Sequence, residues 1–193
     1  HNVLSGADNP TGGDTLAEGI AVKEPGQFTR AIIAERVDEI LLVGEPDLEH
    51  TVALLLQIEK TVVEGAGAAG LAAVLANKEK FAGKKIGLPL CGGNIDSRLL
   101  ATVLLRDLAR QGRLARLRIA LKDQPGALHK VVSLFERHNV NIIEVYHQRV
   151  FTKLPAKGLI TEIECEARNK EQVDALIADM RQTGYDVHSV ELA

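Results

Sequence analysis

The stretch Leu88-Pro89-Leu90-Cys91-Gly92-Gly93-Asn94-Ile95-Asp96 combines an apolar run, a thiol, two glycines and the start of a helix pattern. It predicts a strand that ends near Cys91, a tight turn, and a helix that begins near Ile95. In α/β folds, ligands bind where a strand's carboxyl end meets a helix N-terminus, because free backbone N–H groups and strand-terminal side chains converge there. A core cysteine followed by an ordinary turn produces the same pattern, so both interpretations stay open.

Strands and helices are expected to alternate over residues 38–110. The apolar residues in segments 38–43 and 85–90 are consecutive, which is typical of strands covered on both faces. Helical spacing predicts further helices over about residues 27–36, from Pro46 onward, from Glu64 to about Asn77, and over 95–110. This alternation is typical of a parallel α/β sheet.

The segment 64–73, Glu-Gly-Ala-Gly-Ala-Ala-Gly-Leu-Ala-Ala, consists almost entirely of small residues. A helix with this surface is expected to run close against another backbone or a ligand. Glu64 lies at its predicted start, where the helix dipole favours a carboxylate. A ligand-facing role and a simple N-terminal charge both fit Glu64.

The pattern changes near Gln111-Gly112. Apolar and charged residues alternate over 116–122, which predicts a strand with one buried face. Further strands are expected over 142–150, 159–168 and 186–192. One helix is expected between the strand at 116–122 and the strand at 142–150, and another between the strands at 159–168 and 186–192. Cys165 lies on the face assigned to the core, and the solvent face carries Glu162, Glu164 and Glu166. The resulting β-α-β-β-α-β order is ferredoxin-like.

Residues 123–128, Asp-Gln-Pro-Gly-Ala-Leu, join the first strand and first helix of this second part. A Pro-Gly turn at a helix N-terminus presents free N–H groups that can bind a carboxylate, and Asp123 can bind an ammonium group. The combination suits a free amino acid. A plain turn before a helix has the same sequence, so that interpretation also stays open.

Composition narrows the functional classes. The 193 residues suffice for two small domains, and a net charge of −3 provides no basic footprint for nucleic acid. No apolar run reaches the ~18 residues that a membrane span needs, and neither a phosphate loop nor a zinc-ligand spacing occurs. The two cysteines favour a reducing cytoplasm. The beginning, without Met or a signal pattern, is expected to be truncated or processed.

Three segments, in this order, carry a family resemblance: Thr-Leu-Ala-Glu-Gly-Ile-Ala-Val (15–22), Val-Glu-Gly-Ala-Gly-Ala (63–68) and Leu-Cys-Gly-Gly-Asn-Ile-Asp (90–96). They resemble the C-terminal part of the catalytic domain of threonine dehydratases, also called threonine ammonia-lyases. The remainder resembles an ACT regulatory domain. The resemblance implies an α/β chain with a partial parallel-sheet, pyridoxal-phosphate (PLP) enzyme domain over 1–111 and a ferredoxin-like ACT domain over 112–193.

This resemblance implies deamination of L-threonine to 2-oxobutanoate and ammonia, with serine as a second substrate. By residue-by-residue transfer, Cys91 faces the pyridine nitrogen of the cofactor, Gly19 approaches its ring and Glu64 lies beside cofactor or substrate, with Gly92 next to them. The family's Schiff-base lysine, in a segment like S-F-K-x-R-G, and its Gly-rich phosphate loop are absent. We therefore expect no catalytic residue in this chain, and no activity from the chain alone.

The ACT resemblance implies an effector site between two chains, and therefore a homo-oligomer. Its expected residues are Asp123, Gln124, Pro125, Gly126, Ala127 and Leu128 of one chain, with Asn141 and Ile142 of a second. Isoleucine is the expected effector, while valine, serine and a nucleotide stay open. A stand-alone amino-acid-sensing module and an oligomerisation module with an empty site are the alternative functions.

Overall fold

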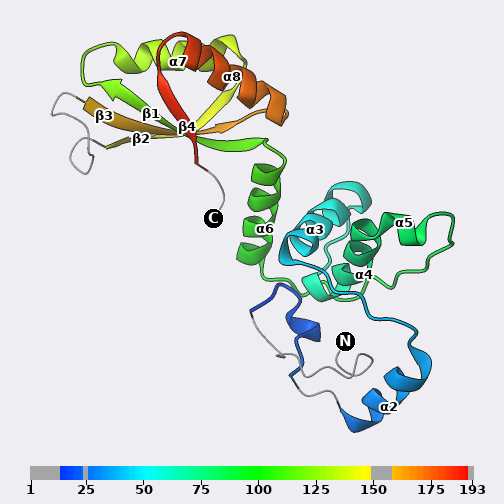
Figure 1. The fold of residues 1–193 in the computed structure, drawn as a ribbon. Coiled ribbons are helices and arrows are strands. Elements are labelled where there is room, and N and C mark those ends of the chain that lie inside the picture. The colour runs from blue at the N-terminus through cyan, green and yellow to red at the C-terminus, as the bar shows by residue number, and fades with distance from the viewer. Residues whose placement is uncertain (1–13, 24–25, 149–157, 191–193) are drawn as a thin grey trace. The chain divides into compact units, whose positions relative to one another are not determined.

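The computed structural model describes residues 14–23, 26–148 and 158–190. The chain forms two compact units, which divide between Leu104 and Leu105 (Figure 1). This division falls inside helix α6 (Ser97–Arg110), whereas the sequence pattern places the domain boundary after residue 111, where that helix has ended. Among the described residues, none of the helices combines the length and apolar character needed to cross a membrane.

Helices dominate the first unit. A 3-10 turn, η1 (Glu18–Ile20), precedes α2 (Gln27–Arg36), α3 (Glu45–Glu59), α4 (Gly65–Ala76), α5 (Lys78–Phe81) and the first part of α6. The four long helices confirm the expected helical segments, and Pro46 lies in the first turn of α3, where its missing N–H costs no hydrogen bond. Helices α3, α4 and α6, with the segment that precedes α4, share a buried core of Val52, Leu55, Val63, Ala68 and Val103.

The two strands expected at 38–43 and 85–90 are not formed. Neither segment has regular secondary structure, and neither belongs to a sheet among the described residues. Leu42 is 72% exposed, Ile86 40% and Leu90 42%. A strand needs a partner for its backbone N–H and C=O groups, so an apolar run without one remains irregular. These strand predictions were therefore wrong for this unit.

The second unit is a four-stranded antiparallel sheet with two helices. Its elements are β1 (Leu114–Lys122), α7 (Ala127–Arg137), β2 (Asn141–Gln148), β3 (Gly158–Glu166), α8 (Lys170–Gln182) and β4 (Asp186–Ser189). The strand order is β2-β3-β1-β4, and α7 and α8 cover the same face of the sheet (Figure 1). The expected β-α-β-β-α-β order is confirmed. Residues 149–150 and 191–192, which the sequence assigned to strand ends, lie outside the described residues.

Cross-strand pairing separates the two faces of this sheet as expected, with one exception. Cys165 is fully buried in the core, where burial raises the pKa of its thiol to about 11. Glu162, expected on the solvent face, is only 7% exposed. It lies opposite Arg118, whose Nε and Nη2 donate to Glu162 Oε1 at 2.8 and 2.6 Å. The guanidinium covers the carboxylate, so this part of the face is closed.

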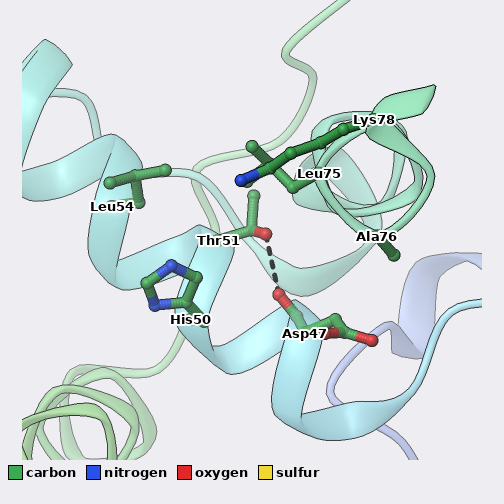
Figure 2. A pocket seen from close by; sticks show the side chains of 7 residues that line it. All are labelled: Asp47, His50, Thr51, Leu54, Leu75, Ala76 and Lys78. Atoms are coloured by element: carbon green, nitrogen blue, oxygen red, sulfur yellow. Dashed lines mark hydrogen bonds between the residues drawn. The ribbon is translucent and has the colours of Figure 1, made fainter. Parts of the chain in front are cut away.

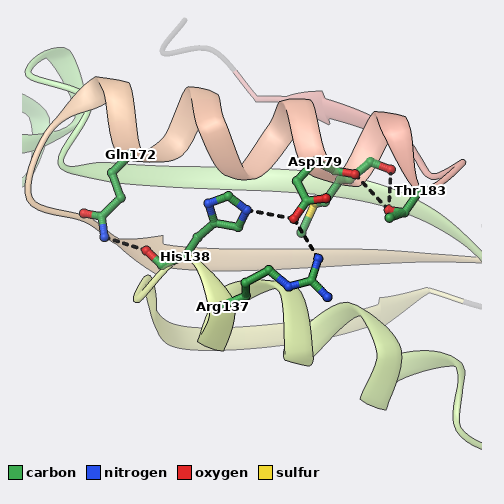
Figure 3. Close-up of polar contacts among 6 residues, drawn as sticks. Arg137, His138, Gln172, Asp179 and Thr183 are labelled. Carbon is green, nitrogen blue, oxygen red and sulfur yellow. Dashed lines mark hydrogen bonds and ion pairs between the residues drawn. The ribbon is translucent and has the colours of Figure 1, made fainter.

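Polar side chains connect the two helices above the sheet (Figure 3). His138 Nε2 lies 2.9 Å from Asp179 Oδ2, and Arg137 Nη1 donates to the same oxygen at 3.1 Å. Gln172 Nε2 donates to the His138 carbonyl at 2.7 Å. The hydrogen bond from His138, followed by that from Arg137, lowers the pKa of Asp179 because both favour its ionised form.

This lowered pKa predicts an acid-sensitive contact between α7 and α8. The ionised Asp179 stabilises the fold fully above its unfolded pKa of ~3.9, and the contribution is lost as pH falls through the lower folded value. We expect Asp179→Asn to lower the free energy of unfolding at pH 7 and to weaken its decline between about pH 5 and 2, as measured by urea denaturation.

Asp174→Asn is the matched control, because Asp174 lies on the same helix and its side chain makes no ion pair or hydrogen bond within the described ranges. Equal effects of the two substitutions would contradict the assignment.

Candidate functional site

The predicted cofactor-contacting residues meet at the first turn of α4. At Gly67 this helix has no side chain, and a Cβ there would overlap the carbonyl oxygen of Cys91. Segment 91–94 therefore rests directly on the helix backbone. The N–H of Glu64, the N-cap residue of α4, donates to the Gly92 carbonyl at 2.9 Å and joins the two segments.

The Glu64 carboxylate lies between two glycines. A Cβ on Gly92 would overlap that carboxylate, and one on Gly19 would come within 3.3 Å of its Oε1. Gly92 also has φ +78°, a left-handed conformation that favours glycine. The Cys91 thiol is unpaired and exposed. The structure thus brings Gly19, Glu64, Cys91 and Gly92 together, in an arrangement the sequence patterns did not provide by themselves.

An anchor that the sequence analysis missed holds the segment that carries Gly19. Glu45, in the first turn of α3, accepts hydrogen bonds from the Thr15 hydroxyl and, at 2.9 Å, from the Leu16 N–H. A Cβ on Gly65 would overlap the Leu16 carbonyl, so the backbone at Leu16 also packs closely against α4. The signal was available only as an acidic residue in a helix's first turn, which is a common feature without a specific meaning.

We refer to these four residues, Gly19, Glu64, Cys91 and Gly92, as the cradle. The Glu64 carboxylate fills the space beside Gly92 and borders Gly19, and the exposed Cys91 precedes Gly92 in the same segment. In the described chain, Lys60 Nζ donates to the Gln57 carbonyl at 2.6 Å, Lys80 pairs with Glu39, and Lys84 lies over the Phe81 ring. Those lysines are thus engaged elsewhere.

The predicted effector loop forms a tight turn before α7. Gly126 has φ +80° and is the N-cap residue of α7, and its carbonyl accepts from the Lys130 N–H at 3.3 Å. The Gln124 carbonyl accepts from the Ala127 N–H at 3.2 Å. A Cβ on Gly126 would meet nothing within 4 Å, so the turn is open on this side.

The other two predicted effector residues lie far from this loop in the same chain. Asn141 and Ile142 begin β2 and pair with Glu166 and Cys165 of β3. Glu166 pairs with Leu114, the first residue of β1, whereas the loop follows Lys122, the last one. The two groups are thus separated by about 26 Å along the sheet, at ~3.3 Å per residue. One copy does not bring them together.

A separate small pocket of about 310 Å³ lies in the first unit (Figure 2). Its lining comes from α3, α4 and α5, and consists of Asp47, His50, Thr51, Leu54, Leu75, Ala76 and Lys78. The Thr51 hydroxyl donates to the Asp47 carbonyl at 2.7 Å and so serves the helix backbone. No predicted site residue lines this pocket.

Two family models match the chain, and together they define its class. A pyridoxal-phosphate dependent enzyme family matches residues 4–92, and the ACT domain matches residues 115–181. The chain therefore joins part of a pyridoxal-phosphate dependent enzyme domain to an ACT domain. The first match contains all four residues of the cradle, and the second contains the loop and the start of β2.

Two relatives that match along most of the chain carry the same name. The chain is 34% identical to L-threonine ammonia-lyase of Thermotoga maritima over 95% of its own length and 46% of that protein. It is 38% identical to the enzyme of the same name from Geobacter sulfurreducens, over 89% of its length and 42% of that protein. The chain thus spans less than half the length of these curated relatives.

Among solved structures, the chain is similar to serine racemase of Dictyostelium discoideum. The two are 33% identical over 49% of this chain and 31% of that chain, with a TM-score of 0.43.

Because Gly67 lies so close to the Cys91 carbonyl, a single added methyl group there is expected to destabilise the fold. We expect Gly67→Ala to lower the free energy of unfolding by about 1–3 kcal/mol, because its Cβ would push the Cys91 carbonyl away from α4. Urea denaturation of the 193-residue chain measures this. Gly70→Ala on the same helix is the control, since its Cβ would meet only the flexible end of Leu88 at 3.3 Å. Similar destabilisation by both would contradict the packing argument.

Proposed function

We propose that this chain is the C-terminal part of a pyridoxal-phosphate dependent threonine ammonia-lyase whose activity an amino acid regulates through the ACT domain. The observation that carries the proposal is the match to L-threonine ammonia-lyases over 95% and 89% of the chain, across both units. The products would be 2-oxobutanoate and ammonia, with serine as a second substrate. Both cysteines are unpaired, which fits the expected cytoplasmic location.

The cradle around α4 supports one side of the cofactor site. Bound pyridoxal phosphate would supply an electron sink for removal of the substrate α-proton. In this chain, Glu64 places its carboxylate directly beside Gly19 and Gly92, the positions where the family resemblance expects the cofactor ring. A thiol such as that of Cys91 forms only weak hydrogen bonds, so it would leave a pyridine nitrogen unprotonated.

We infer that the 193 residues do not catalyse the reaction alone. The unpaired segments 38–43 and 85–90 expose apolar side chains that a sheet would bury, which supports a domain completed by other polypeptide. The relatives are more than twice as long as the matched region, in line with this. Lys60, Lys80 and Lys84 contact Gln57, Glu39 and Phe81, respectively. None of these three lysines lies in a segment like the family's S-F-K-x-R-G.

An activity assay tests this directly. The purified 193-residue chain, with added pyridoxal phosphate and L-threonine, should form 2-oxobutanoate no faster than an enzyme-free control. The full-length Thermotoga maritima enzyme, assayed alongside, establishes that the conditions support turnover. Turnover by the chain that approaches this reference would refute the inactive-fragment proposal. If the purified protein has an intact mass well above 20.8 kDa, it carries polypeptide in addition to these 193 residues.

We further propose that the effector binds between two copies of the second unit. Strand β2 is at the edge of the sheet and runs parallel to β1, since both pair antiparallel to β3. If two β2 edges pair antiparallel, Asn141 of the second copy reaches the end of the sheet where the first copy has its 123–128 loop. The α7 N-terminus would bind the effector carboxylate and Asp123 its ammonium group, with isoleucine as the expected effector.

Gly126→Val tests the regulatory proposal. Its φ of +80° disfavours a β-branched residue, so the turn must change shape, and the isoleucine affinity measured from the amide shifts of residues 123–128 should fall at least tenfold. Gly83→Val is the matched control, because Gly83 has φ +73° and open space but lies in the first unit. Undiminished isoleucine-induced shifts of residues 123–128 in Gly126→Val would contradict the proposal. Loss of these loop shifts with an unchanged oligomeric mass would argue against a purely assembling role.

A further inference from the structure

The second unit contains a pocket that none of the predicted sites uses. It has a volume of about 740 Å³ and lies where β1 begins, among the last turns of α6, the first half of α8 and the end of β4. That volume is in the range of pockets that bind small molecules. Apolar side chains form much of its surface, including Leu105, which is 53% exposed, and Val190, which is 39% exposed.

One stripe of α8 supplies both charge and apolar surface to this pocket. Lys170, Val173, Asp174 and Ile177 all line it, and their spacing of three and four residues puts them on one helix face. Within the described ranges, the side chains of Lys170 and Asp174 make no ion pair or hydrogen bond. An ammonium group and a carboxylate of the protein therefore border the same apolar surface without a partner.

The walls of the pocket are closely built. Gly112, in the left-handed conformation with φ +68°, brings the turn after α6 against α8, where a Cβ would lie 2.6 Å from Lys170 Cβ. The N–H of Val190 donates to the Arg116 carbonyl at 2.8 Å and continues the sheet edge. Arg116 itself is paired with Glu164, so this pair contributes no unmatched charge.

We propose that this pocket binds a small zwitterionic amino acid with an aliphatic side chain. Lys170 would bind the carboxylate and Asp174 the ammonium group, while the side chain packs on Val173 and Ile177. This charge complementarity, one unpartnered group of each sign beside an apolar surface, selects a zwitterion over a simple carboxylate or amine. The site lies at the opposite end of β1 from the 123–128 loop and is independent of the effector proposal.

Chemical-shift mapping on the full 193-residue chain tests this proposal. The protein carries Gly126→Val, which removes the loop site, and the probe is L-isoleucine. We expect saturable amide shifts at residues 105–116, 170–177 and 189–190. The analogues 3-methylpentanoate and 2-methylbutylamine, which lack the ammonium and the carboxylate respectively, should bind at least tenfold more weakly.

Adding Asp174→Asn should weaken isoleucine binding at least tenfold, while Glu171→Gln, a carboxylate in the same helix that does not line the pocket, should leave it unchanged. The proposal is overturned if no saturable shifts appear around the pocket, if both analogues bind like isoleucine, or if Asp174→Asn has no effect. Shifts confined to 123–128 in the unmodified chain would support the loop site and overturn only the pocket.

Discussion

The first unit depends on a close contact between two backbones, which a missing side chain permits. Because Gly67 has no Cβ, helix α4 meets the Cys91 carbonyl directly, and the hydrogen bond from Glu64 to Gly92 secures the same junction. No strand pairing contributes here among the described residues. The cradle for the proposed cofactor thus exists because a helix of small residues replaces side-chain packing with backbone contact.

The second unit depends on the long register between β1 and β3. Nine successive pairs hold these strands, so everything attached to the two ends of β1 is separated by the full length of the sheet. The turn at Gly126 lies at one end, and the start of β2 and the pocket beside α8 lie at the other. The same register therefore supports both an effector site shared by two copies and a second, independent site within one copy.

Charge placement shows how local patterns and tertiary contacts differ. The alternation in β3 assigned Cys165 to the core correctly, because side chains of a strand alternate whatever surrounds them. The same alternation assigned Glu162 to solvent, yet Arg118 on the neighbouring strand covers it. The two-residue period of a strand determines which face of the sheet a side chain lies on. The side chain opposite it on the neighbouring strand determines whether it is exposed to solvent.

Local patterns determined the long helices of both units, the β-α-β-β-α-β order and the small-residue surface of α4, because these depend on periodicity and turn residues within a few positions. The family resemblance indicated Gly19, Glu64, Cys91 and Gly92 as site residues in three separate sequence motifs. Only the tertiary structure decided that they meet at one helix turn, that segments 38–43 and 85–90 stay unpaired, and that Lys170 and Asp174 border a pocket. Each of these depends on contacts between residues far apart in the chain, which no short-range pattern specifies.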